Sequence, residues 1–303
     1  MKPSLSLSKD VRTAIDAGRA IVALESTIIT HGMPYPQNLE TAQLVEADVR
    51  ASGAVPATIA VLDGVIHVGL EPEQLEKLAR TENARKLSRA DLAICLAERK
   101  TGATTVAATM ICAAMAGIEV FATGGIGGVH RGAETSFDVS ADLYELAQTP
   151  VTVVGAGAKA ILDLPKTLEV LETLGVPVIS VGQDDLPGFW ARSSGLKSPQ
   201  RLDRAEDIAA AHRLRAGLGL PGGQLVANPI PVRDEIPLSV ISPMIEQALA
   251  EAVAQNIGQK QVTPFLLSRI FELTEGASLV ANIALVRNNA RLAAEIARAL
   301  ITI

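Results

Sequence analysis

The stretch PVTVVGAGAKAILDLPKTLEVLETLGVPVISV, residues 150–181, contains the pattern from which the fold of this chain is predicted. Its two short runs rich in β-branched residues, Pro150 to Val154 and Val176 to Val181, are typical of strands covered on both faces of a sheet. Between them, Asp163 and a nearby proline open a helix that stops at Gly175. A strand, a helix and a second strand in this order predict a sheet that is at least partly parallel.

The same alternation extends through the first half of the chain. Ala20 to Glu25 and Glu119 to Thr123 are further strand-like runs. We expect a helix over residues 38–52, capped by the side chain of its asparagine, and a buried helix over Ala103 to Ala116. In Thr58 to Val68, two apolar runs flank an Asp-Gly pair, which indicates a hairpin. We therefore predict an α/β fold, a three-layer α/β/α sandwich with a mixed, partly parallel sheet.

The C-terminal part is mostly helical in its pattern. Ser242-Pro243, Thr263-Pro264 and Ala277 each open a segment with helical spacing. Two stretches rich in glycine, proline and polar residues, Gly182 to Leu202 and Gly217 to Pro237, are predicted as loops, and loops of that length tend to be functional or disordered. Neither has the composition of a linker, so we predict a single domain over the whole chain, 1–303.

Composition restricts the class of protein and of partner. Of the 303 residues 48% are hydrophobic and 3% aromatic, and the formal net charge of -6 argues against a surface built for nucleic acid. Cys95 and Cys112 lie in apolar helical surroundings and are expected to be buried, reduced thiols. The apolar stretch from Ala103 to Gly125 contains Glu119 and does not predict a membrane span. Because Met1 to Arg12 carries charges and no apolar core, we expect a cytoplasmic protein.

Lys159 is the most informative single residue. It follows a predicted strand through Gly155-Ala156-Gly157-Ala158, where glycines let backbone and ligand approach closely. No carboxylate is adjacent in sequence, and an amine among small apolar groups has its charged form disfavoured, which is the condition for a lysine that forms Schiff bases. The alternatives are a solvated surface lysine and a plain phosphate binder.

The segment ALESTIITHGMPYP, residues 23–36, places Glu25 directly after a strand and before several hydroxyl side chains and His31. Polar groups at the carboxyl end of a strand are where α/β folds build their sites. A half-buried Glu25 could hold a proton at neutral pH and donate it. The alternatives are a helix-capping or salt-bridged carboxylate and a histidine satisfied within a turn.

Two further segments carry suggestive patterns. TGGIGGVHRG, residues 123–132, follows a strand and has glycines of the kind that expose amides to phosphate, although a tight structural turn fits equally. In FDVSADL, Asp138, Ser140 and Asp142 alternate, so an extended backbone would point all three to one side, toward a hard cation or a sugar phosphate. The alternative is that Ser140 caps a helix. Because a full set of protein ligands is missing here, a bound ion would be largely water-coordinated, which favours Mg²⁺ or Mn²⁺ over structural zinc.

Two isolated polar residues complete the candidates. Lys86, in KLSRAD, either meets a phosphate or faces solvent. Asn282 lies on an apolar helix face, so its amide needs a partner, which is either a neighbouring group or a ligand.

Together these segments resemble the pseudouridine-5'-phosphate glycosidase family, also called the indigoidine synthase A family, from about Ser8 to Ala299. Each string is modest alone, but in this order they are highly specific. The strings that carry the resemblance are ALESTIITHGMPYP, PATIAVLDGVIHVGL, GATTVAATM, FATGGIGGVHRG, FDVSADL, VVGAGAKAILDLPKTLE and SLVANIALVRNNA.

The resemblance implies reversible cleavage of pseudouridine 5'-phosphate to uracil and ribose 5-phosphate. Lys159 falls on the Schiff-base lysine of the family and Glu25 on the proton donor. Asp138 falls on the position that holds one divalent ion per subunit, typically Mn²⁺, mainly through waters; Mg²⁺ or another divalent ion is an alternative. The residues that fall on substrate-contacting positions or in the same pocket are Lys86, Val106, Ser140, Ala141, Asp142, Thr123, Gly124 and Asn282. The family fold is an α/β/α sandwich assembled as a trimer, so we expect small-molecule substrates and a homotrimer, with no nucleic acid or membrane partner.

The implied chemistry is consistent with these residue types. A C-glycoside has no heteroatom leaving group, so the usual route through paired carboxylates cannot break the bond, and covalent catalysis by a lysine is the natural answer. Two alternatives stay open. One is a class I aldolase-like phosphosugar lyase, usually an eight-stranded barrel, although eight strand-helix units are not found in the sequence. The other is a non-catalytic sugar-phosphate-binding accessory protein.

Overall fold

The computed structural model describes residues 3–255, 257 and 262–303, so Met1 and Lys2, which begin the stretch expected to lack an apolar core, lie outside the described residues. The strands are β1 (Leu5–Leu7), β2 (Ile21–Leu24), β3 (Val55–Leu62), β4 (Val65–Val68), β5 (Arg85–Leu87), β6 (Gly102–Thr104), β7 (Val120–Ala122), β8 (Thr152–Gly155), β9 (Val178–Ser180), β10 (Gln200–Arg201) and β11 (Gln224–Ala227). The helices are α1 (Lys9–Asp16), α2 (Thr27–His31), α3 (Gln37–Ala51), α4 (Pro72–Ala79), α5 (Leu92–Ala97), α6 (Val106–Met115), α7 (Ala133–Ser136), α8 (Ala141–Leu146), α9 (Leu164–Thr173), α10 (Ala205–Gly217), α11 (Leu238–Ala254), α12 (Val262–Leu273) and α13 (Ala277–Leu300), with a 3₁₀ turn η1 (Val232–Asp234).

The strands of the described residues form one sheet in the order β1-β4-β3-β2-β7-β8-β11-β9-β10, with β6 paired to β3 and β5 to β6. The neighbours β2, β7, β8 and β11 are parallel to one another. The pairs β3–β4 and β3–β6 are antiparallel. The sheet is therefore mixed and mostly parallel, and the carboxyl ends of its four central strands meet at one edge, where α/β folds build their sites.

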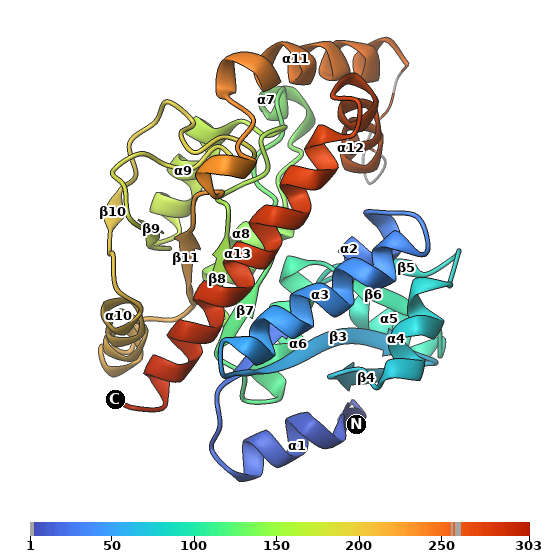
Figure 1. Cartoon of the computed structure of the whole chain (residues 1–303), viewed down its shortest axis with the longest axis vertical. Helices are drawn as coiled ribbons and strands as arrows, with labels where there is room; N and C mark the ends of the chain where they lie inside the picture. The colour runs from blue at the N-terminus through green and yellow to red at the C-terminus, as the bar shows by residue number, and fades with distance from the viewer. Residues whose placement is uncertain (1–2, 256, 258–261) are drawn as a thin grey trace.

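Helices cover both faces of this sheet. Figure 1 shows α3 and α13 side by side across the near face, with α6 and α8 behind the strands. Helix α13 packs on β2, β7 and β8, whereas α6 packs on β2 and β3 and against α8. This arrangement confirms the predicted α/β fold with helices outside a mixed sheet. Because β1 and β10 end the strand order without pairing to each other, the described strands do not close into the barrel that is usual for the aldolase alternative.

The elements predicted from the opening stretch are confirmed. β8 and β9 occupy the two β-branched runs, and the Asp163 side chain caps α9 by accepting a hydrogen bond from the backbone amide of Lys166 at 3.1 Å. The predicted hairpin is β3–β4, in which Asp63 and Gly64 both have positive φ, as a tight hairpin turn requires. The two cysteines are buried, and burial raises the pKa of the Cys112 thiol to about 12.

Two predicted helix boundaries are wrong. Ala103 lies in β6, which pairs with β3 and β5, so the helix begins only at Val106. In the C-terminal part, α11 begins at Leu238 and contains Pro243 inside it, because the helix accepts the loss of one backbone hydrogen bond there. Helices α12 and α13 occupy the other two predicted segments, which confirms the helical C-terminal part.

Two further predictions are corrected by long-range contacts. The predicted loop Gly217 to Pro237 contains β11, a buried strand between β8 and β9 whose flanking glycines and prolines, in PGGQLVANPIP, indicated a loop. Asn38 does not cap its helix, because α3 begins at Gln37. Instead, the buried Asn38 amide donates to the carbonyl oxygens of Ile29 at 2.8 Å and Ala79 at 2.9 Å, which ties three segments together.

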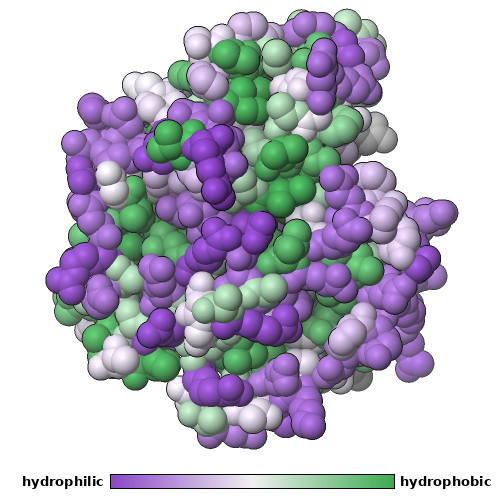
Figure 2. Space-filling view, viewed as in Figure 1, coloured by the Kyte–Doolittle hydropathy of each residue, from purple (hydrophilic) through white to green (hydrophobic). Residues whose placement is uncertain are grey.

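Figure 2 shows hydrophilic and hydrophobic side chains interspersed over the face that α3 and α13 cover. Among the helices of the described residues, none combines the length and the apolar character needed to cross a bilayer.

Candidate active site

Three neighbouring strands deliver the main candidates to one edge of the sheet. Glu25 follows β2, Thr123 follows β7, and Lys159 follows β8 after a short turn. Because these strands are adjacent and parallel, their carboxyl ends bring together residues that are far apart in the sequence.

A cavity of about 1090 Å³ opens at this edge. Most of the predicted site residues line it, namely Glu25, Lys86, Val106, Gly124, Asp138, Ser140, Asp142, Lys159 and Asn282. Two predicted residues do not belong to its described lining. Thr123 is buried behind Glu25, with 2% of its surface exposed, and Ala141 lies in the first turn of α8.

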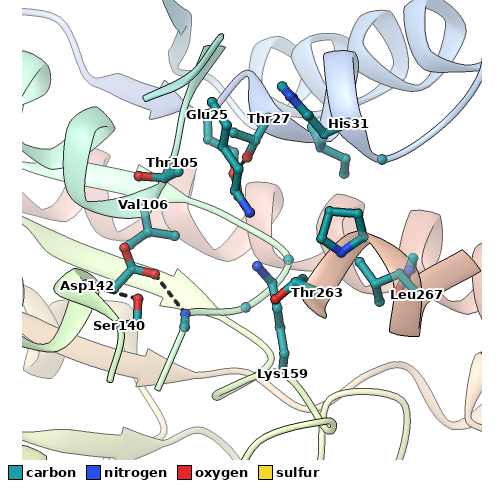
Figure 3. A pocket seen from close by; sticks show the side chains of 18 of the residues that line it. Glu25, Thr27, His31, Thr105, Val106, Ser140, Asp142, Lys159, Thr263 and Leu267 are labelled. Carbon is teal, nitrogen blue, oxygen red and sulfur yellow. Dashed lines mark hydrogen bonds between the residues drawn. The ribbon is translucent and has the colours of Figure 1, made fainter. Parts of the chain in front are cut away.

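The cavity has two chemically different ends with Glu25 and Lys159 between them (Figure 3). We call one the polar end, formed by Lys86, Thr105, Val106, Ser140 and Asp142. We call the other the apolar end, where Leu267 lies, with Thr263 and His31 on the same side. The cavity lining also includes the apolar residues Phe189, Phe271, Leu285 and Val286. An elongated ligand with one charged and one flat apolar end is the type of molecule that matches this arrangement.

Glu25 is half-buried and held at both carboxylate oxygens. Its Oε2 accepts a hydrogen bond from the Thr27 hydroxyl, and its Oε1 accepts one from the Thr123 hydroxyl. No lysine or arginine of the described residues forms an ion pair with Glu25, so the salt-bridge alternative does not apply. The carboxylate instead faces the cavity with its orientation fixed by neutral donors.

Lys159 leaves the sheet through a tightly packed turn. Its backbone amide donates to the Ile126 carbonyl oxygen at 3.1 Å, and Gly157 turns the chain at φ +81°. The facing Gly125 cannot carry a side chain, because a Cβ there would lie 2.8 Å from the ring of Phe189. The Lys159 side chain points into the cavity (Figure 3), and it forms no ion pair with a described carboxylate. This is not the position of a solvated surface lysine.

The polar end is built on the N-terminus of α6. Thr105 is the N-cap residue and Val106 the first helical residue, and both line the cavity, whereas the Ala107 amide of the same turn is bonded to Asp142. The Thr105 hydroxyl oxygen is buried and has no hydrogen-bond partner among the described residues. Lys86 approaches the same helix start, because it pairs with Ala103 of β6 in the sheet. Backbone amides, a hydroxyl and an ammonium in one place are the groups that bind phosphate.

Of the two interpretations of FDVSADL, the one in which Ser140 caps a helix is confirmed, and Asp138, Ser140 and Asp142 all line the same cavity without a continuous extended chain. Ser140 begins α8 and caps it, since its Oγ accepts from the Asp142 amide at 3.2 Å. The helical turn rotates Asp142 inward, where its carboxylate accepts from the amides of Ala107 at 2.9 Å and Gly127 at 2.8 Å. Asp142 therefore holds the glycine-rich loop against α6.

The glycine-rich loop acts mainly as a structural turn. A Cβ on Gly127 would lie 2.3 Å from Ser140 Oγ, so the close approach of the loop to α8 requires glycine. Five of the backbone amides of residues 123–132 donate within the protein: Thr123 to Val154, Ile126 to Gly157, Gly127 to Asp142, Val129 to Thr167 and His130 to Asp138. These five amides hold the loop in place and are not available to a ligand.

The surroundings of Asp138 are those of a residue that could hold a hydrated cation. Its half-buried carboxylate lines the cavity with the hydroxyls of Ser136 and Ser140. Within the described residues, no group of three or more His, Cys, Asp or Glu side chains could enclose a metal ion. One carboxylate with hydroxyl neighbours fits a hard cation that keeps most of its water shell, and it does not fit a structural zinc site.

The pKa values of two histidines in the cavity lining are affected by the nearby lysines. Burial lowers the pKa of His31, and the Lys86 ammonium lowers it further. Burial also lowers the pKa of His130; Asp138 raises it, and the ammonium groups of Lys159 and Lys86 lower it. Both lysines therefore act on the same space, and a field of this sign favours an anionic ligand.

Asn282 finds its partner within the protein. Its Oδ1 accepts a hydrogen bond at 2.7 Å from the indole Nε1 of Trp190, which also donates to the Ser278 carbonyl at 3.1 Å. The predicted loop around Trp190 is thus attached to α13 and brings Phe189 into the cavity wall.

Four residues of the site were not predicted from the sequence, namely Thr27, Thr105, Phe189 and Leu267. Of these, only Thr27, a hydroxyl close to Glu25 in the sequence, carried a local signal.

Comparisons with known proteins agree over nearly the whole chain. A family model described as "Indigoidine synthase A like protein" matches residues 10–299. The chain is 68% identical over 298 residues to a pseudouridine-5'-phosphate glycosidase of Jannaschia sp. (strain CCS1), covering 98% of this chain and 99% of that relative. It is 70% identical to a protein of the same name from Paracoccus denitrificans (strain Pd 1222), with 100% of both chains covered.

Solved structures are similar as well. The prealnumycin C-glycosynthase AlnA in complex with ribulose 5-phosphate superposes with a TM-score of 0.92 at 38% identity, covering 100% of this chain and 98% of that one. An indigoidine synthase A-like protein from Thermotoga maritima superposes with a TM-score of 0.89 at 35% identity, covering 99% and 97%.

Proposed function

The chain belongs to the family of indigoidine synthase A-like proteins, and from that premise we propose that it is an enzyme that reversibly cleaves the C–C glycosidic bond of pseudouridine 5'-phosphate, giving uracil and ribose 5-phosphate. Relatives at 68% and 70% identity are named for this activity, and a similar C-glycosynthase was solved with a pentose phosphate. The observation that carries the proposal is that Glu25 and Lys159 border one cavity between a polar and an apolar end.

The two ends orient the substrate. The phosphate binds at the N-terminus of α6, where the helix dipole, the first-turn amides and Lys86 favour an anion. The unpartnered Thr105 hydroxyl gains a hydrogen bond to the bound phosphate. In this orientation the base would lie toward the apolar end, and C1' of the ribose would lie next to Glu25 and Lys159, which Figure 3 shows between the two ends.

The mechanism follows from the chemistry of a C-glycoside. Glu25 donates a proton to the ring oxygen as the C1'–O bond breaks, and neutral Lys159 Nζ forms a bond to C1'. The secondary ammonium then loses a proton to the Glu25 carboxylate, which passes it to uracil C5. The nitrogen lone pair forms a C=N bond while the C1'–C5 bond breaks, which releases uracil. Water adds to the iminium at C1', and ribose 5-phosphate leaves with its aldehyde oxygen from that water as neutral Lys159 is restored and a proton returns to Glu25.

The proposal also includes a bound divalent ion, a trimeric assembly and a cytoplasmic location. Asp138 would hold one Mn²⁺ per subunit, or Mg²⁺ or another divalent ion, largely through waters. A bound divalent ion supplies positive charge that neutralises and orients anionic substrate groups. We also propose a cytoplasmic homotrimer as the working form.

Borohydride trapping tests the proposed function. The protein is incubated with ribose 5-phosphate and reduced, and we expect a covalent adduct on the peptide that contains Lys159. In parallel, release of uracil from pseudouridine 5'-phosphate is followed by chromatography. Lys159→Ala should lose both signals, whereas Lys197→Ala, which removes an exposed lysine paired with Asp185, should keep them.

The same experiment decides between the alternatives. An adduct with no uracil release would support the aldolase-like lyase. Full uracil release by Lys159→Ala would contradict the covalent mechanism. Absence of both signals in the unmodified protein would favour the non-catalytic accessory protein.

A further inference from the structure

The contacts of Glu25 place two threonines in a specific relation to the reaction. Thr27 is the first residue of α2 and borders the cavity, and Thr123 follows the neighbouring strand β7. Their hydroxyls donate to different oxygens of the same carboxylate. A carboxylate bound at both oxygens by donors on two separate elements cannot rotate about its terminal bond without breaking one of them.

The backbone of Thr123 is fixed by two hydrogen bonds. Its backbone amide donates to the Val154 carbonyl at 2.9 Å, and its carbonyl accepts from the Asn289 amide at 2.8 Å. Asn289 is 0% exposed, and its Oδ1 accepts from Asn228 at 3.1 Å. A fully bonded buried amide of this kind is rigid, because each broken bond would leave a buried polar group unsatisfied. The position of the Thr123 hydroxyl is therefore fixed by α13, β8 and β11 together.

We propose that Thr27 and Thr123 are positioning residues that hold the Glu25 carboxylate toward the ribose ring oxygen, an inference that rests on the proposed function. The hydroxyl of Thr123 is directed to Glu25, so its role differs from the substrate contact that the resemblance implied.

The test replaces each hydroxyl by a methyl group of the same shape. Thr27→Val and Thr123→Val should each lower kcat for pseudouridine 5'-phosphate cleavage by roughly 10- to 100-fold, with KM changed by less than about 3-fold, because the lost donors act on Glu25 and not on the bound substrate. Thr27→Ser and Thr123→Ser keep the hydroxyl and should stay within about 5-fold of the unmodified kcat.

The matched control is Thr152→Val. Thr152 is also buried, at 0% exposed, and its hydroxyl is hydrogen-bonded to His212 and Gln224, but it lies at the opposite end of β8. This variant should lower the melting temperature about as much as Thr123→Val while leaving kcat unchanged. If Thr123→Val does not fold, the Thr27 pair of variants decides the question alone, because Thr27 is only half-buried at the cavity wall.

A second measurement asks whether the effect acts through Glu25. In a Glu25→Gln background, adding Thr27→Val should change kcat by less than about 2-fold, because the carboxylate it positions is gone. The proposal is overturned if the valine variants keep kcat, if they raise KM at constant kcat, or if their effect is undiminished in that background. Uracil release by the unmodified protein is measured first. Its absence would overturn the proposed function and this inference with it, whereas active protein with unaffected valine variants would overturn the inference alone.

Discussion

The polar and apolar ends of the cavity are built in opposite ways. The polar end is made by backbone geometry: a helix N-terminus, a capping serine and a buried aspartate whose oxygens bind two amides. The apolar end is made by side chains, among them Leu267 of α12 and His31 of α2. Backbone groups are fixed by the fold, so we expect the polar end to be rigid. The apolar end consists of side chains, so we expect substitutions to change its shape.

The largest expected effect comes from breaking the polar end. Lys86→Ala should weaken binding of ribose 5-phosphate by about 100-fold, since it removes one member of a charged pair with the phosphate. Calorimetric titration measures the effect, with Lys77→Ala at an exposed lysine as the control. Binding of unphosphorylated ribose should not change; an equal loss for both sugars would contradict the placement of the phosphate.

A smaller effect is expected at the apolar end. Leu267→Ala should raise KM for pseudouridine 5'-phosphate by about 5-fold, because it removes apolar surface next to the base. Affinity for ribose 5-phosphate alone should be unchanged, which separates this end of the cavity from the other. Leu218→Ala, at a leucine that is 73% exposed, is the control. A loss shared by both ligands would show that Leu267 shapes the whole cavity.

The smallest expected effect is a decrease in stability at low pH that is caused by protonation of His31. Burial and Lys86 lower the pKa of His31 below its ordinary value of 6.5. The unfolded chain therefore binds the proton first as the pH falls, so stability is lost from about pH 6.5 downward and the loss is complete below the folded pKa. Because His31 lies at the cavity rim, we expect a decrease in melting temperature of no more than about 2 °C. Lys86→Met should lessen the decrease, and a larger decrease in that variant would contradict the assignment.

The edge of the sheet that carries the candidate site could be predicted because the sequence patterns that mark it are local. A β-branched run followed by a polar residue identified Glu25, and a run followed by a small-residue turn identified Lys159. The capping pattern at Asp163 was equally local and is confirmed. Once the strands are known to be parallel neighbours, their carboxyl ends must lie at the same edge of the sheet, which brings Glu25 and Lys159 together.

What the sequence could not predict depends on contacts between distant segments. The choice between an extended FDVSADL and a helix beginning at Ser140 was decided by the capping bond and by the two amides that receive Asp142. β11 is stabilised by its buried position between two strands, whereas the glycines and prolines on both sides of its QLVA segment indicated a loop. The pairing of Thr123 with Glu25 requires the register of β2 and β7, which no local pattern specifies.

The bond between Trp190 and Asn282 has a consequence for how the cavity contacts a base. An indole N–H can only donate, so it fixes the Asn282 amide with its oxygen turned toward the tryptophan. Asn282 lines the cavity, so under the proposed function its amide nitrogen is the group that would donate to a carbonyl oxygen of the bound base.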